Sequence, residues 1–157
     1  MFRFETDRDL IQSFRPRDRR VMEMPPGLTF PLFVRDYLAW TETSGARVYL
    51  VFSAPGSHQP IGIIFRRDVG GGPDISRMCE WCHDYGSSVD LLTTDVNSKR
   101  RVGISLCVDL RCKDKLEDAA NRAGRHTLAS LDQLRAHMYR FANEALGIEA
   151  RPSAPAA

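Results

Sequence analysis

The sequence lacks the features that would place it in a membrane or in a strongly charged class. It has no apolar run near the roughly 18 residues of a membrane span, which excludes an integral membrane protein. The opening stretch, MFRFETDRDL, has no apolar signal core, so we expect a cytoplasmic protein without a membrane partner. With 22 basic and 20 acidic residues the net charge is only +2, so affinity for a charged macromolecule must come from a local patch. The 157 residues suit one compact domain.

Cysteine is scarce, and its distribution is informative. The chain has only four cysteines, in a Cys-x2-Cys pair and a Cys-x4-Cys pair: Cys79, Cys82, Cys107 and Cys112. Disulfides are rare in a reducing compartment. Zinc takes four thiolates at tetrahedral corners, and each short spacing lets one turn supply two of them. The spacing therefore predicts one structural zinc ion whose filled shell leaves no position for a substrate.

Other interpretations of the cysteines fit the sequence less well. A thioredoxin-like redox pair would follow a buried strand, which GGPDISRM is not, and four unrelated core cysteines would not cluster in this way. A zinc deaminase needs His-x-Glu and a proline before its Cys-x-x-Cys. Here Met78 precedes Cys79, and His58 is followed by Gln59, so that interpretation fails. His83 remains a possible substitute ligand, although four thiolates already suffice.

The apolar pattern and the cysteine positions together predict an α+β fold made of antiparallel hairpins, a treble-clef zinc finger and a C-terminal amphipathic helix. Thr6 and Asp9 form a capping pattern ahead of a short first helix. Alternating apolar residues predict two hairpins, formed by 47–54 with 60–67 and by 89–96 with 101–108. Residues 33–40 predict a helix-like or irregular apolar face. Helices are expected over 108–123 and from about 130 to 146, where Gly147 ends the second.

These elements suggest one domain over residues 1–150. Its expected parts are an N-terminal helix and hairpin half (8–76), a zinc finger (77–125) and a C-terminal helix (126–147), followed by a disordered tail (148–157). A turn, a hairpin and a helix, with ligands at the turn and at the helix start, form the treble-clef arrangement. The positive end of the helix dipole favours a thiolate at Cys112.

The segments MCEWC and RVGISLCVDLRC, separated by the second hairpin, carry a family resemblance. The most specific part is Gly103-x-x-x-Cys107-Val108-Asp109-Leu110-x-Cys112. It resembles the C-terminal treble-clef zinc finger of elongation-factor-G-binding proteins, the FBP domain of the fusidic-acid-resistance group, and the likeness covers about residues 8–146. The resemblance implies a non-enzymatic bacterial factor that binds elongation factor G, a GTPase, and helps to free it from the ribosome. It also implies that the four cysteines bind zinc.

Exposed basic residues and one tryptophan are the candidates for a partner surface. From Asp95 to Arg125 the sequence has eight Lys/Arg against five Asp/Glu, and a second basic stretch covers residues 15–20. Such charges suit an acidic protein face or ribosomal RNA. The alternative is a solvated surface with helix pairs such as Lys113 with Glu117. The partner-binding candidates are Trp81, Lys99, Arg100, Arg101, Arg111 and Lys113. For Trp81, packing over the zinc site is the alternative.

Three classes of function are compared. The preferred function is binding of elongation factor G, with the ribosome as a possible further partner. The alternative is a zinc-stabilised RNA- or DNA-binding module. The near-neutral total charge and the absence of interleaved aromatics count against direct nucleic-acid binding. No nucleophile–base pattern is visible, and DVGGGPD lacks the Lys-Ser/Thr of a phosphate loop. We therefore expect no catalysis.

Overall fold

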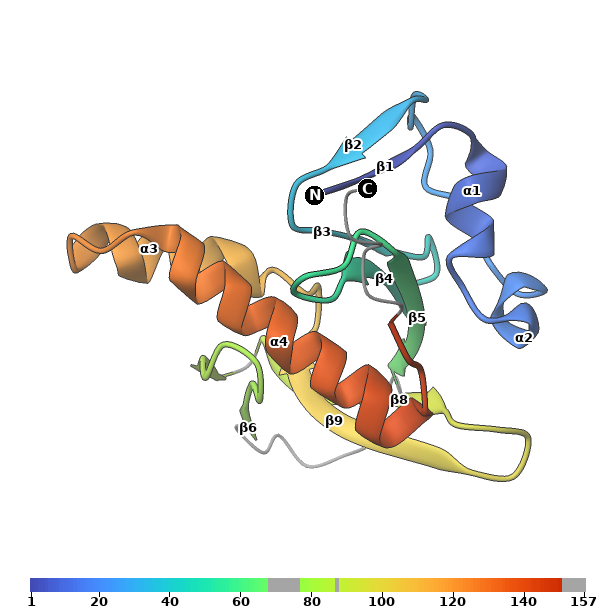
Figure 1. The fold of residues 1–157 in the computed structure, drawn as a ribbon. Helices are drawn as coiled ribbons and strands as arrows, with labels where there is room; N and C mark the ends of the chain where they lie inside the picture. Colours follow the sequence, from blue (N-terminus) through green and yellow to red (C-terminus); the bar gives the residue numbers. More distant parts are fainter. Residues whose placement is uncertain (68–76, 87, 151–157) are drawn as a thin grey trace.

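A five-stranded antiparallel sheet forms the middle of the molecule (Figure 1). The structure is a computed structural model and describes residues 1–67, 77–86 and 88–150. The strand order in the sheet is β3-β4-β5-β8-β9. The strands are β3 (Tyr37–Thr41), β4 (Arg47–Ser53), β5 (Pro60–Arg67), β8 (Val89–Asp95) and β9 (Arg101–Cys107). Both predicted hairpins, β4–β5 and β8–β9, are confirmed, as is the mixed fold of helices and antiparallel strands.

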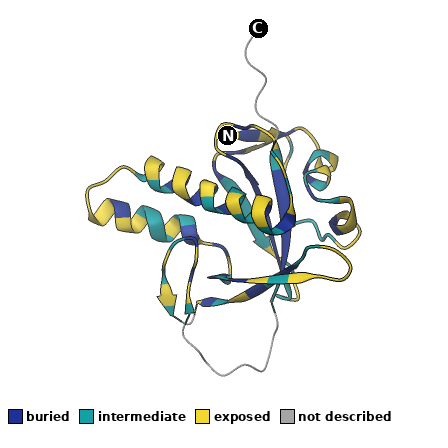
Figure 2. Cartoon of the chain, turned by 60° about the horizontal axis from the view of Figure 1, so that its bottom comes forward, coloured by how far each residue is buried: buried dark blue, intermediate teal, exposed yellow. Residues whose placement is uncertain are grey.

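Both faces of the central strands are buried (Figure 2). Val48, Leu50 and Phe52 of β4 face one apolar cluster, which also contains the cysteines and the C-terminal helix. Tyr49 and Val51, which alternate with them, face a second cluster formed with the N-terminal segments. The sheet is therefore a middle layer between two separate cores.

The C-terminal helix covers the first face. Helix α4 (Thr127–Leu146) crosses the sheet and buries one stripe of apolar side chains (Figure 1). Arg135 of α4 donates hydrogen bonds to the Ser53 carbonyl (3.0 Å) and the Ala54 carbonyl (3.2 Å), which fixes the helix to the end of β4. The predicted helix end is confirmed, since Gly147 adopts a left-handed φ of 68° as the cap.

The N-terminal segments cover the second face. They comprise β1 (Phe2–Phe4), α1 (Asp7–Gln12), α2 (Pro16–Arg19) and β2 (Leu32–Val34), and β1 pairs with β2. The capping box predicted from Thr6 and Asp9 is present at the start of α1. Phe14 packs directly on Gly62 of β5, where an added Cβ would lie 2.6 Å from the ring. Glycine at this position therefore allows the chain after α1 to approach the sheet closely.

Two predicted elements differ from the structure. The apolar residues within 33–40 form strands, not a helix-like face, because Tyr37 and Ala39 pack on the first cluster while Leu38 and Trp40 pack on the second. Phe33, the first residue of this apolar stretch, is exposed. The helix expected over 108–123 is shorter, because α3 spans Cys112–Arg122 and a turn precedes it.

Other expectations concern the limits of the domain. The five-stranded sheet contains strands from both the 8–76 half and the 77–125 finger, so the expected subdivision stays a prediction. The segment DVGGGPD and residues 151–157 of the expected tail lie outside the described residues. Among the residues that the structure describes, no helix combines the length and apolarity needed to cross a bilayer.

Candidate metal centre

The first cysteine pair lies on a tight turn between two short strands, β6 (Arg77–Met78) and β7 (Tyr85–Gly86). The Cys79 carbonyl accepts a hydrogen bond from the His83 N–H (2.9 Å), and the Cys79 N–H donates to the Asp84 carbonyl (2.8 Å). His83 closes the turn with a left-handed φ of 63°. The Glu80 N–H donates to the Ser105 carbonyl of β9 (2.9 Å), so this turn is attached to the sheet.

The second cysteine pair spans the end of β9 and the start of α3. Cys107 is the last residue of β9, and Cys112 is the first residue of α3. Between them the Leu110 N–H donates to the Cys107 carbonyl (3.0 Å), and Leu110 has a left-handed φ of 56°. This turn replaces the first helical turn expected from residue 108. Cys112 does lie in the first turn of its helix, as expected, where free N–H groups and the helix dipole favour a thiolate.

The four sulfur atoms have the spacing of a zinc site. All lie within 4.8 Å of one another, and the cluster contains three buried cysteines and one half-buried cysteine. Cys79 Sγ is 3.7 Å from Cys112 Sγ, and Cys82 Sγ is 3.5 Å from Cys107 Sγ. A tetrahedral zinc ion with Zn–S bonds of about 2.3 Å would separate its sulfurs by about 3.8 Å. These cysteines are close enough to bind one zinc ion.

The thiols also require a cation for electrostatic reasons. Hydrogen bonds among them lower the pKa of Cys79, above all through Cys107, and the same network raises the pKa of Cys112. Four thiolates at these distances repel one another, so they do not all ionise without a compensating charge. A divalent cation would supply that charge, and four soft sulfur ligands at tetrahedral spacing suit zinc.

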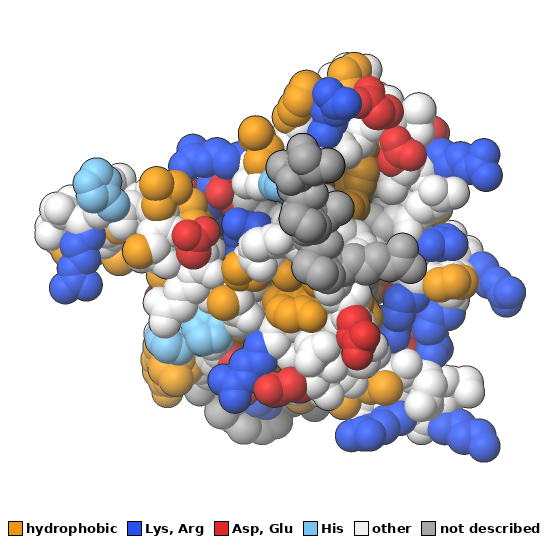
Figure 3. All heavy atoms as spheres, in the orientation of Figure 1, with side chains coloured by type: hydrophobic (Ala, Val, Ile, Leu, Met, Phe, Trp, Pro, Cys, Tyr) orange, Lys and Arg blue, Asp and Glu red, His pale blue; other side chains and the backbone are white. Residues whose placement is uncertain are grey.

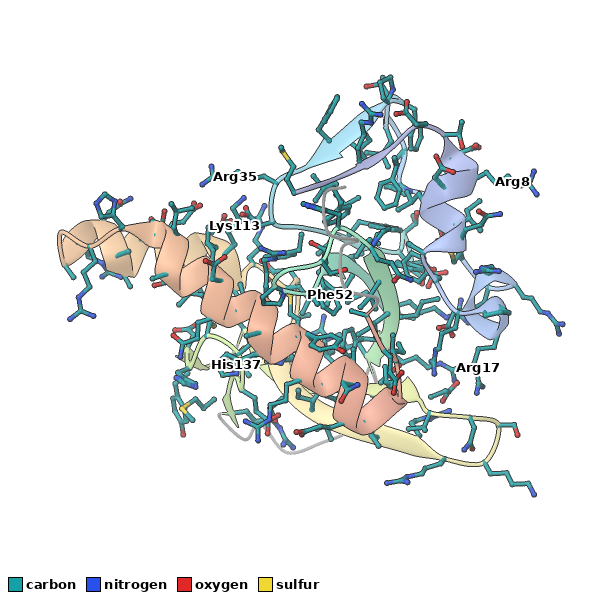
Figure 4. The ribbon with its side chains drawn as sticks, in the orientation of Figure 1. Arg8, Arg17, Arg35, Phe52, Lys113 and His137 are labelled. Carbon is teal, nitrogen blue, oxygen red and sulfur yellow. The ribbon has the colours of Figure 1, made fainter. Side chains whose placement is uncertain are left out.

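His83 does not join this group. Within the described ranges, the candidate ligand cluster around the cysteines contains the four thiols and no histidine. The His83 side chain is exposed, and its ring centroid lies 6.4 Å from that of His137 (His137 is labelled in Figure 4).

Lys115 is a charged neighbour of the metal centre. Its Nζ lies 3.2 Å from Cys107 Sγ, 2.6 Å from Asp84 Oδ2 and 3.1 Å from Ser88 Oγ. Partial burial opposes ionisation, but the hydrogen bonds to Asp84 and Cys107 raise the pKa of Lys115 above its ordinary value. A permanent ammonium beside a four-thiolate site offsets part of the site's negative charge.

Residues of β3 hold the second cysteine turn from the other side. The Tyr37 hydroxyl donates to the Leu110 carbonyl (2.5 Å) and accepts from the Lys113 N–H (3.1 Å). Lys113 Nζ forms an ion pair with the buried Asp36, and not with Glu117. Lys113, which is labelled in Figure 4, therefore connects α3 to the N-terminal half through Asp36 and Tyr37.

The assignment of Trp81 to the partner surface is wrong. Its side chain is only 4% exposed, because it packs edge-on against Phe65 (6.0 Å between centroids) and Phe141 (6.3 Å). The cysteine turn therefore directs this side chain into the first core, where it attaches the metal centre to α4. The alternative for Trp81 is packing over the zinc site, and its side chain does lie in the cluster that contains Cys79, Cys107 and Cys112.

The remaining basic candidates are exposed at two places. Lys99, Arg100 and Arg101 lie at the β8–β9 tip, and Arg111 lies just before α3 with 72% of its side chain exposed. The structure also brings the basic stretch of residues 15–20 to the tip. Arg15 donates to the Asp95 carbonyl (2.5 Å) and the Val96 carbonyl (3.2 Å).

Comparison with known proteins identifies the family. The model of the FBP C-terminal treble-clef zinc-finger family matches residues 8–145. The chain belongs to this family. The match extends over the range expected from MCEWC and RVGISLCVDLRC, and it agrees with a site for one zinc ion.

Among solved structures, the fold is similar to one described as the structure of the fusidic acid resistance protein FusC. The TM-score is 0.49 at 18% sequence identity, with 69% of this chain and 50% of that chain covered. This FBP-family chain thus spans about half the length of that protein. A sequence comparison of the present chain with curated proteins found no match.

Sequence reasoning missed the positioning roles of three residues: Tyr37 and Lys115 at the metal centre, and Arg15 at the β8–β9 tip. Tyr37 and Arg15 act on segments more than 70 positions away, which no local pattern shows. Lys115 follows Cys112 by three positions and therefore lies on the same face of α3. This spacing is a sequence signal that places a lysine beside the metal centre.

Proposed function

We propose that this FBP-family protein binds elongation factor G and promotes its release from the ribosome, without catalysing a reaction itself. Membership of the family over residues 8–145 supports the proposal, because the resemblance of MCEWC and RVGISLCVDLRC implies that partner. Such a role would place the protein in the cytoplasm. We assign the zinc ligands to Cys79, Cys82, Cys107 and Cys112, as structural groups.

The observation that carries the proposed contact is the exposed β8–β9 tip. Lys99 and Arg100 form no ion pair with any residue in the described part of the chain, and Arg101 is half-exposed while it pairs with Asp95 (2.9 Å). A rigid loop loses little conformational freedom on binding, and its charges speed association with an acidic face. Arg111, which lies apart from the tip, is the second proposed contact.

Release requires a difference in affinity. A factor that binds free elongation factor G more tightly than the ribosome-bound form shifts the population toward the dissociated state. The free energy comes from binding, and no bond is made or broken.

The first test is titration of zinc-loaded protein against purified elongation factor G from the same cell, at low and at physiological salt. We expect saturable one-to-one binding that survives physiological salt. Reversal of the tip charges in Lys99→Glu, Arg100→Glu and Arg101→Glu combined should weaken it at least about tenfold, which is 1.4 kcal/mol. The matched control, Arg122→Glu with Arg125→Glu and Arg140→Glu, should bind normally.

A second measurement tests release. Elongation factor G that fusidic acid holds on ribosomes is pelleted with and without the protein, and we expect a smaller retained fraction in its presence. Absence of one-to-one binding, or equal loss in the tip variant and the control, would contradict the proposal.

A further inference from the structure

Basic residues of helix α2, strand β5 and the β8–β9 tip meet around Asp95. Figure 3 shows blue side chains on the side of the molecule where α2 and the tip lie, among others elsewhere on this face. We define the basic surface by Arg17, Arg66, Lys99, Arg100 and Arg101, which pair with Asp95 or line the hollow beside it. Arg20, which is exposed and lies three positions after Arg17 at the end of α2, is included because that spacing puts both on one helix face. Arg15, which is partly buried and paired with Asp18 (3.0 Å), joins α2 to the base of the tip through its two backbone hydrogen bonds.

One carboxylate lies at the centre of this surface. Asp95 is 2.9 Å from Arg101, 3.1 Å from Arg66 and 3.7 Å from Arg17. Burial opposes ionisation, but the Arg101 hydrogen bond and the Arg66 and Arg17 charges hold the pKa of Asp95 below its ordinary value. Each guanidinium has five N–H donors, so a single carboxylate orients the three arginines and leaves most of their donors unused.

A hollow of about 250 Å³ opens beside Asp95. Arg17, Asp95 and residues 97–101 line it, and every one of these residues has a polar or charged side chain. Clustered arginine and lysine side chains are the groups that bind phosphate backbones. The planar guanidinium also matches two phosphate oxygens at once.

We propose that the basic surface binds the phosphate backbone of RNA. This inference does not depend on elongation factor G, because the surface includes α2 and β5 residues that the proposed protein contact does not use. Binding to the backbone positions the protein without reading sequence. In the cell it would give a factor that acts near ribosomes its own contact with ribosomal RNA.

The test uses the zinc-loaded full chain and a labelled RNA stem-loop, with no other protein present. Affinity is measured from about 50 to about 200 mM salt, and we expect the logarithm of the association constant to fall linearly with the logarithm of salt concentration. Arg17→Gln with Arg20→Gln should weaken binding about tenfold at low salt and reduce the slope by about 2, one for each lost phosphate contact. Arg122→Gln with Arg125→Gln, which removes the same charge at the C-terminal end of α3 and just after it, should change neither value.

Three results would overturn the inference. The first is no binding to the stem-loop at low salt, and the second is equal weakening by the control pair. The third is competition by poly-L-glutamate as effective as that of unlabelled RNA at equal charge, which would indicate a surface for carboxylates. The proposed contact with elongation factor G is tested separately with the same double variant. If Arg17→Gln with Arg20→Gln loses affinity for RNA but keeps its affinity for elongation factor G, the two contacts are distinct, and failure of either proposal leaves the other standing.

Discussion

The Tyr37 hydroxyl donates a hydrogen bond to the Leu110 carbonyl, across 73 positions of the sequence. It also accepts the Lys113 N–H, so one side chain of the edge strand β3 satisfies two backbone groups beside the second cysteine turn. Burial raises the pKa of Tyr37, which keeps its hydroxyl protonated and able to donate. The metal centre is thereby attached to the N-terminal half without a covalent bond.

Replacing Tyr37 by Phe should lower the free energy of unfolding by about 2 kcal/mol, because two backbone groups lose their partner. Urea denaturation of the zinc-loaded protein measures the change. Tyr85→Phe is the matched control, since that side chain is 66% exposed, and it should have almost no effect. An equal stability of both variants would show that the Tyr37 bonds contribute nothing.

Removal of the metal should unfold the zinc finger while the second core persists. The two tryptophans report on the two regions: Trp81 lies in the first cysteine turn, and Trp40 stacks on Tyr49 in the second core at 5.0 Å between centroids. On chelation, or in Cys112→Ser, the emission of Trp81 in a Trp40→Phe background should shift to the red. The emission of Trp40 in a Trp81→Phe background should change much less. Unchanged emission and an unchanged thermal midpoint after metal removal would contradict a structural role for zinc.

Lys115→Met should reduce zinc affinity about tenfold, the lower end of the effect expected for a residue that contacts a ligand. The reason is that the ammonium 3.2 Å from Cys107 Sγ offsets the negative charge of the thiolate site. Competition with a chromogenic chelator measures the affinity. Lys99→Met removes the same charge at the hairpin tip and should leave zinc affinity unchanged; if both variants lose affinity equally, only the total charge matters.

Gly62→Ala should destabilise the protein by about 1–3 kcal/mol, the usual cost of overpacking. The added Cβ would collide with the Phe14 ring, which is 1% exposed and has little room to move. Gly103→Ala provides the comparison, because its nearest neighbour, Leu91 at 3.2 Å, is 39% exposed and free to shift. Thermal denaturation should therefore show a larger loss for Gly62→Ala, and Phe14→Leu should partly rescue it.

Local patterns predicted the elements that local chemistry specifies. The Thr6 capping box, the β4–β5 hairpin and the Gly147 cap each depend on residues a few positions apart. The cysteine spacing likewise indicated the metal centre, because each turn supplies two thiols.

Long-range packing accounts for what the sequence did not show. Strand β3 was missed because its two faces pack on different cores, so Tyr37, Leu38 and Trp40 do not alternate between apolar and polar. No local pattern shows that Trp81 is buried, because the core that covers it includes Phe141 of the last helix. The basic surface joins segments about 80 positions apart, and only the fold brings Arg15 to Asp95.

The hairpin β8–β9 is held at both of its ends. Cys107 ends β9, Arg101 begins it, and a strand of this length spans about 20 Å. Arg15 fixes the end near the tip, and the cysteines fix the other. Oxidation of the cysteines or a shortage of zinc would therefore affect the tip from about 20 Å away. The hairpin would lose its attachment at the metal centre and keep only the Arg15 hydrogen bonds near the tip. The ability of the tip to meet a partner would then depend on the redox state and metal supply of the cell as well as on the charges it carries.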